Sequence, residues 1–117
     1  MATQAKAIVL GPGEGKKFSA TSNEVTYKAV SEEIGGAYAL IEYKAAPVFT
    51  GNPRSIQRDR ETALYVLEGE LTVQVGDQTG KAPAGAFIQV PRGSVFAFSN
   101  PGSKPARFLA LYSPGGF

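Results

Sequence analysis

The chain has 117 residues, of which 43% are hydrophobic and 19% charged, and its formal net charge is +2. This length supports one domain, expected to span residues 1–117, and so small a charge predicts no nucleic-acid partner. Cysteine and histidine are both absent, which excludes disulfides, thiolate nucleophiles and the zinc and iron–sulfur sites that cysteines form.

The beginning of the chain, residues 1–10, contains no long apolar run. We therefore expect neither a signal peptide nor a membrane-spanning segment, and no membrane partner. A cytoplasmic location is the default expectation for such a chain.

Eight short segments follow one another along the chain, most of them rich in β-branched or aromatic residues, and no helix of convincing length is evident. Short strands at such intervals predict an all-β barrel or sandwich. The expected strands are Ala7–Leu10, Glu24–Val30, Ala37–Ala45, Ala63–Glu68, Glu70–Val75, Ala86–Val90, Val95–Phe98 and Ala106–Tyr112.

Turn-forming residues separate these segments. Gly69 lies between two β-rich segments and predicts a tight reversal, and Gly76-Asp77 predicts another. Asn100 precedes Pro101 and Gly102, where its side chain can close a turn.

Two stretches within about residues 51–100 share a spacing of glycine, proline and asparagine: the first can be anchored on Gly69, and the second contains Gly85, Pro91, Gly93 and Asn100. These stretches resemble the two motif blocks of the cupin family. The resemblance is to small single-domain bacterial cupins of the quercetin-dioxygenase-like type. It implies a single cupin-type β-barrel, which is a jelly-roll-like double-stranded β-helix.

In the cupin family the two blocks commonly deliver three histidines and one glutamate to a metal. The alignment places these four positions at Ser55, Gln57, Thr62 and Phe96; a spacer one residue shorter moves the first two to Ile56 and Arg58. Phenylalanine has no atom that can coordinate a metal, and the other residues are not the usual ligands. We therefore expect no metal and no cofactor.

A cupin barrel without a metal still implies an interior that can hold a ligand. If Ser55, Gln57 and Thr62 point inward, they offer neutral hydrogen-bonding groups opposite Phe96. A competing interpretation is that Phe96 simply fills the former metal site. Further candidate residues are Tyr43, Gln89, Phe98 and Tyr112 in the pocket lining, with Arg54 and Arg58 at its mouth, where they could attract an anionic group or be part of a solvated loop.

These observations favour a metal-independent cupin that binds a small, partly apolar organic molecule. A cofactor-free isomerase, cyclase or lyase in the same cavity is an alternative, with Glu42, Glu61, the tyrosines or a lysine as acid–base candidates. A structural role as a homodimer with a filled core is the third hypothesis, because related cupins commonly dimerise and open sheets have edges to protect.

Overall fold

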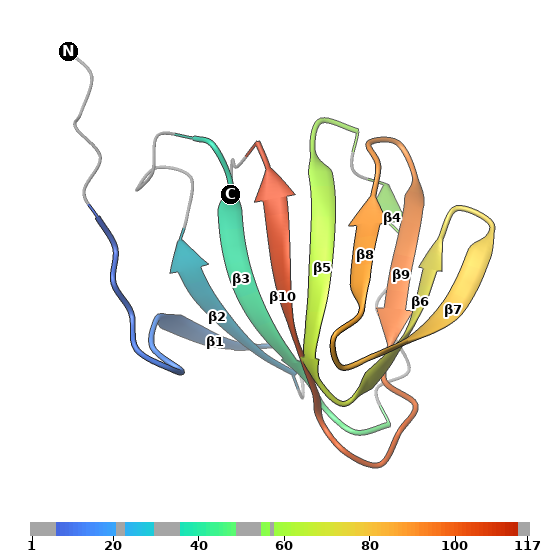
Figure 1. The fold of residues 1–117 in the computed structure, drawn as a ribbon, viewed down its shortest axis with the longest axis horizontal. Coiled ribbons are helices and arrows are strands. Elements are labelled where there is room, and N and C mark those ends of the chain that lie inside the picture. Colours follow the sequence, from blue (N-terminus) through green and yellow to red (C-terminus); the bar gives the residue numbers. More distant parts are fainter. Residues whose placement is uncertain (1–6, 21–22, 30–35, 49–54, 57, 115–117) are drawn as a thin grey trace.

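The computed structural model describes residues 7–20, 23–29, 36–48, 55–56 and 58–114 (Figure 1). Within these ranges the chain forms β-strands and no helix, which confirms the predicted all-β class. Accordingly, the described ranges contain no helix long and apolar enough to cross a membrane. The strands are β1 (Lys16–Ala20), β2 (Asn23–Ala29), β3 (Ala39–Ala45), β4 (Ser55–Ile56), β5 (Glu61–Glu68), β6 (Glu70–Val75), β7 (Gln78–Pro83), β8 (Phe87–Val90), β9 (Val95–Ser99) and β10 (Ala106–Ser113).

The strands form two antiparallel sheets. The larger sheet has the order β1-β2-β3-β10-β5-β8, and the smaller one has the order β4-β9-β6-β7. The two sheets face each other as a sandwich that does not close into a continuous barrel, since β8 and β7 are edge strands of different sheets (Figure 1). The predicted barrel is therefore an open one.

The hydrophobic core lies between the sheets because alternate residues of each strand point inward. The larger sheet contributes Leu64 and Val66 from β5 and Phe108 from β10, and the smaller one contributes Leu71 and Phe98. Burial alternates along β5 and β10, as expected for strands with one face against the core. The remaining buried members are Ala45, Val73, Ala82, Ala106 and Ala110.

Most predicted strands are present, with ends shifted by one or two residues where they differ. The prediction for Ala7–Leu10 was wrong, because this segment is exposed and has no strand partner within the described residues. Three strands were not predicted: β1, β4 and β7. Strand β7 is largely exposed and polar, and it forms because the predicted Gly76-Asp77 turn brings Gln78 into register with Val75.

Gly69, at the reversal between β5 and β6, combines a positive φ of 79° with close neighbours. A Cβ atom there would lie 2.8 Å from the Pro105 carbonyl oxygen and 3.0 Å from the Ala106 Cα. We expect Gly69→Ala to destabilise the protein by about 2–3 kcal/mol, from left-handed strain and displacement of the Pro105–Ala106 backbone.

Gly93→Ala is the matched control, because Gly93 has a similar φ of 82° but no atom within 4 Å of the place that an alanine methyl would occupy. It should cost only about 1 kcal/mol, the contribution of the strain alone. Urea unfolding of both variants provides the comparison, and equal losses would show that the contact with Pro105 is unimportant.

Candidate ligand-binding site

The positions that correspond to the metal ligands of cupins fall on both sheets. Ser55 on β4 pairs with Phe96 on β9. Thr62 lies on β5 in the opposite sheet, where it is buried between Val90 and Tyr112 of the neighbouring strands. The other position, Gln57, lies outside the described residues, as does Arg54 at the predicted mouth.

The residues at these positions do not fit the metal centre that the resemblance to cupins implies. Phe96 offers no donor atom, and a neutral threonine hydroxyl stands where a carboxylate would bind. Within the described ranges, no group of three His, Cys, Asp or Glu side chains could hold a metal ion. We therefore assign no metal-dependent step to this site.

The Thr62 hydroxyl is the most unusual polar group of the interior. Thr62 is 3% exposed, and its Oγ1 atom has no hydrogen-bond partner among the described residues. Leaving a buried hydroxyl unpaired costs about 1–3 kcal/mol. Buried polar groups normally have partners, so this hydroxyl is suited to one that the described residues do not supply.

Three further polar groups are connected to Thr62 through Tyr112, its neighbour on β10. Tyr112 is its partner in register, and the Tyr112 side chain is hydrogen-bonded to that of Tyr43. The guanidinium carbon of Arg60 lies 6.0 Å from the centre of the Tyr112 ring, a cation–π arrangement. We call Tyr43, Arg60, Thr62 and Tyr112 the Thr62 cluster.

The environment of Tyr112 keeps its hydroxyl protonated. Burial raises the pKa of Tyr112 well above its ordinary value of 10.0, and the neighbouring Tyr43 raises it further. The positive charge of Arg60 lowers the same pKa, but this effect is smaller. At neutral pH Tyr112 therefore remains a neutral hydrogen-bonding group and is unsuited to act as a base.

This raised pKa predicts a loss of stability in alkali. Below pH 10 Tyr112 is protonated in both states, whereas above pH 10 only the unfolded chain releases its proton. The free energy of unfolding should then fall by up to about 1.4 kcal/mol per pH unit from this group alone. Urea unfolding between pH 8 and 11 tests this, and Tyr112→Phe should show a shallower fall; an unchanged slope would contradict the assignment.

Aromatic rings fill the interior next to the Thr62 cluster. Tyr43 stacks on Phe108 with ring centres 5.1 Å apart and planes 7° from parallel. Phe98 packs edge-on against Phe108 at 5.1 Å and contacts Phe96 at 6.0 Å. Phe96 is partly buried, and its ring packs against the buried core.

The predicted lining residues separate into two groups. Tyr43, Phe98 and Tyr112 converge in the interior, whereas Gln89 is exposed. Gln89 alternates with Ile88 and Val90, which point inward, so its side chain lies on the outer face of the larger sheet. The interior position expected for Gln89 was therefore incorrect.

Among the arginines, Arg58 is exposed, and it is Arg60 that contacts the interior. From the sequence, Arg54 and Arg58 are candidates, but no role is predicted for Arg60. The one local signal was its spacing, since a residue two positions before Thr62 shares the face of Thr62 when the chain is extended. Contact with the Tyr112 ring, which is distant in sequence, could not be foreseen.

The chain matches the model of the protein family described as "Cupin domain" over residues 49–112. This region covers more than half of the chain and includes β4 to β9 and most of β10. No curated protein sequence matches the chain.

Several solved structures share the fold. A predicted oxalate decarboxylase from Thermotoga maritima aligns with a TM-score of 0.83 at 16% identity, covering 92% of this chain and 99% of its own. KdgF from a Halomonas species aligns with a TM-score of 0.81 at 11% identity, covering 96% of both chains. The cupin domain of Schizosaccharomyces pombe Cnp3 has a TM-score of 0.71 at 16% identity; 83% of this chain is covered but only 64% of that one. At these identities the similarity shows the fold alone.

Proposed function

This chain belongs to the cupin family, and from that premise we propose that it binds a small, partly apolar organic molecule with an anionic group, without a metal. The binding site is the Thr62 cluster together with the part of the interior next to Phe96. The observation that carries this proposal is the buried Thr62 hydroxyl, which has no hydrogen-bond partner among the described residues.

The chemistry of the cluster supports the ligand class. Arg60 brings a permanent positive charge to the cluster, and a guanidinium is well suited to bind a carboxylate through two parallel hydrogen bonds. The rings of Phe96 and Tyr112 offer flat apolar surface, so an aromatic monocarboxylate matches the combination.

The enzymatic alternative has less support from the described residues. Glu42 and Glu61, the two carboxylates considered as acid–base groups, do not lie in the interior: Glu42 pairs with Arg107, and Glu61 is exposed. The raised pKa of Tyr112 keeps that side chain protonated. Binding without turnover is therefore the function that the site supports best.

The proposal is tested by titrating the protein with aromatic monocarboxylates and their uncharged amides, with benzoate and benzamide as one matched pair. Calorimetry should show each acid binding about tenfold more tightly than its amide, since a charge-assisted hydrogen bond contributes about 1.5–3 kcal/mol. Arg60→Gln should remove this preference and leave amide binding unchanged. Absence of binding for every pair would refute the proposal.

Thr62→Val should change stability and binding in opposite directions. Valine has almost the same shape but no hydroxyl, so the variant should be more stable than the wild type by about 1–2 kcal/mol. Its affinity for the bound acid should fall, because the hydroxyl no longer contributes a hydrogen bond.

Thr72→Val is the control for this change, since Thr72 lies half-buried on β6 and points away from the interior. It should leave ligand affinity unchanged. Thermal unfolding and calorimetry report the two quantities, and a Thr62→Val variant that is less stable than the wild type would mean that the hydroxyl has a partner.

A further inference from the structure

We propose that a groove on the outer face of the larger sheet binds a straight-chain aliphatic carboxylate. The groove has a volume of about 510 Å³. It is separate from the Thr62 cluster, because Leu40 and Leu109 in the groove point away from the core, whereas Thr62 points into it. The inference therefore goes beyond ligand binding in the interior and does not depend on it.

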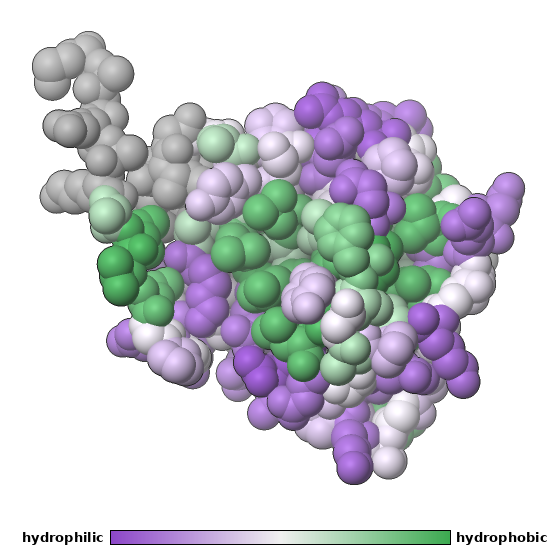
Figure 2. All heavy atoms as spheres, in the orientation of Figure 1, coloured by the Kyte–Doolittle hydropathy of each residue, from purple (hydrophilic) through white to green (hydrophobic). Residues whose placement is uncertain are grey.

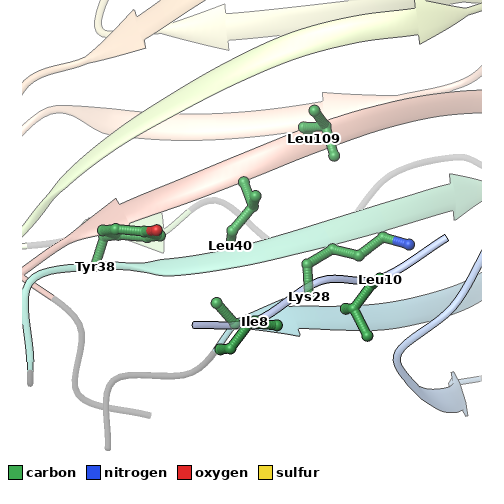
Figure 3. A pocket seen from close by; sticks show the side chains of 7 residues that line it. Ile8, Leu10, Lys28, Tyr38, Leu40 and Leu109 are labelled. Carbon is green, nitrogen blue, oxygen red and sulfur yellow. The ribbon is translucent and has the colours of Figure 1, made fainter. Parts of the chain in front are cut away.

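The groove has an apolar floor and an apolar wall. Leu40 on β3 and Leu109 on β10 form the floor, and Ile8 and Leu10, on the segment before β1, form the wall (Figure 3). In Figure 2 hydrophobic residues gather over β3, β10 and β5, so the floor belongs to a wider apolar surface. An alkyl chain lying along this floor would be removed from water on two sides, which is the main source of affinity for such a ligand.

A β-bulge in β2 brings a cation to this groove. Tyr27 pairs with Ile41 and Ala29 pairs with Leu40, so β2 advances two residues where β3 advances one, and Lys28 is the extra residue. Lys28 and Ala29 both line the groove, although neighbouring residues of a regular strand point to opposite faces. Bulges often redirect a side chain beside a functional site. The bulge is thus an indication of a binding site that is independent of the apolar lining.

The Lys28 amino group can bind the head of the ligand. Its Nζ donates a hydrogen bond of 2.6 Å to the backbone carbonyl oxygen of Glu14, which is a neutral group. The Glu42 carboxylate lies 3.8 Å away, beyond hydrogen-bond distance, and accepts a hydrogen bond from Arg107 at 3.0 Å. An ammonium group has three hydrogens, so Lys28 can donate to a further acceptor. A carboxylate is the acceptor that best suits a cation.

The wall of the groove is held against β2 by contacts at its end. The Glu14 N–H donates to the Gly11 carbonyl oxygen at 3.1 Å, and the Gly11 N–H donates to the Glu14 carboxylate. Gly15 approaches β2 so closely that a Cβ atom would lie 2.5 Å from the Tyr27 carbonyl oxygen. These contacts and the hydrogen bond from Lys28 fix the segment, so little ordering is required when a ligand binds.

Calorimetric titration with hexanoate, octanoate and decanoate tests the ligand class. Each added pair of methylene groups should tighten binding about fivefold or more, because the chain is buried along the floor of the groove. Octanoate should bind about tenfold more tightly than octanol, since only the acid forms a charge-assisted hydrogen bond. Affinities that do not change with chain length, or equal affinities for octanoate and octanol, would overturn the proposal.

Lys28→Gln tests the head of the site. Glutamine removes the charge and keeps an amide that can donate to the Glu14 carbonyl oxygen. The variant should lose the preference for octanoate over octanol, and its affinity for octanol should change little. An equal loss of affinity for both ligands would show that Lys28 only holds the wall in place, which would contradict its assignment as the group that binds the carboxylate.

Leu109→Ser tests the floor and should weaken both octanoate and octanol about tenfold. Leu111→Ser is the matched control, because Leu111 is half-buried on the same face of β10 but does not line the groove. It should bind both ligands like the wild type. Equal weakening by the two variants would mean that the chain does not lie along Leu109.

Arg60→Gln separates this groove from the Thr62 cluster and should leave the affinity for octanoate unchanged. In NMR spectra octanoate should shift the methyl signals of Leu40 and Leu109 and leave those of the buried Leu64 in place. Loss of octanoate binding in Arg60→Gln, or shifts confined to the interior, would overturn the proposal. Octanoate affinity that falls as protein concentration rises would mean that another copy of the chain covers the groove, and it would also overturn the proposal.

Discussion

Replacing Asn100 with alanine is expected to destabilise the protein by about 4 kcal/mol. The side chain is buried, and its amide nitrogen donates to the carbonyl oxygens of Ala46 at 3.1 Å and Lys104 at 2.8 Å, with Ala45 at 3.3 Å. Its Oδ1 accepts a hydrogen bond from the Gly102 backbone N–H at 3.1 Å. Alanine leaves these backbone groups without their partner, and each unpaired buried group costs about 1–3 kcal/mol.

Asn100→Asp separates the two halves of this hydrogen-bond network. A carboxylate can still accept from Gly102, but it has no amide hydrogens and would place a negative charge against carbonyl oxygens. We therefore expect Asn100→Asp to be at least as destabilising as the alanine variant at neutral pH, by about 4 kcal/mol or more. Chemical denaturation measures both, and an aspartate variant close to wild-type stability would show that the contact with Gly102 dominates.

The role of Asn100 was only half predictable from the sequence. The turn at Pro101-Gly102 is a local feature, and the hydrogen bond from Gly102 confirms the predicted turn-closing side chain. The contacts with Ala45 and Ala46 join residues more than fifty positions apart. No local pattern reveals such a contact, because it depends on how β3 and the loop before β10 meet in three dimensions.

The same distinction explains which strands were predicted. Strands β5 and β10 contribute one buried face to the core, so hydrophobic residues alternate along them and the pattern is visible. Strand β7 is largely exposed and lacks that alternation, so its pairing with β6 comes from the hairpin turn. The segment Ala7–Leu10 shows the opposite case, in which apolar residues alone do not make a strand without a partner.

In the candidate site, the spacing of the cupin motif identified positions in the chain but not the contacts that their side chains make. The alignment marked Thr62 and Phe96, and the strand register places both on inward-facing positions of opposite sheets. Two features depend on how side chains pack between neighbouring strands. The Thr62 hydroxyl lacks a hydrogen-bond partner among the described residues, and Arg60 contacts the Tyr112 ring. These features decide the ligand class proposed above, and only the structure supplies them.

Phe108→Ala is expected to cost about 4 kcal/mol, because it removes a ring that is 1% exposed from the centre of the aromatic core. Phe18→Ala is the matched control. Both phenylalanines have an aromatic neighbour at 5.1 Å, Tyr43 for Phe108 and Tyr27 for Phe18, but Phe18 is 53% exposed. The control should lose less than about 1 kcal/mol, so the difference between the variants measures burial rather than ring contact.

The cavity left by Phe108→Ala also distinguishes a filled core from an open one. If the surrounding residues hold their positions, the space is apolar and enclosed, and benzene should bind there and restore part of the lost stability. The unaltered protein should gain nothing from benzene at that place, because Tyr43, Phe98 and Phe108 already fill it. A Phe108→Ala variant that neither loses stability nor responds to benzene would mean that the interior collapses or is open to water. Stability restored by benzene would show that the interior around position 108 is enclosed and sealed from water.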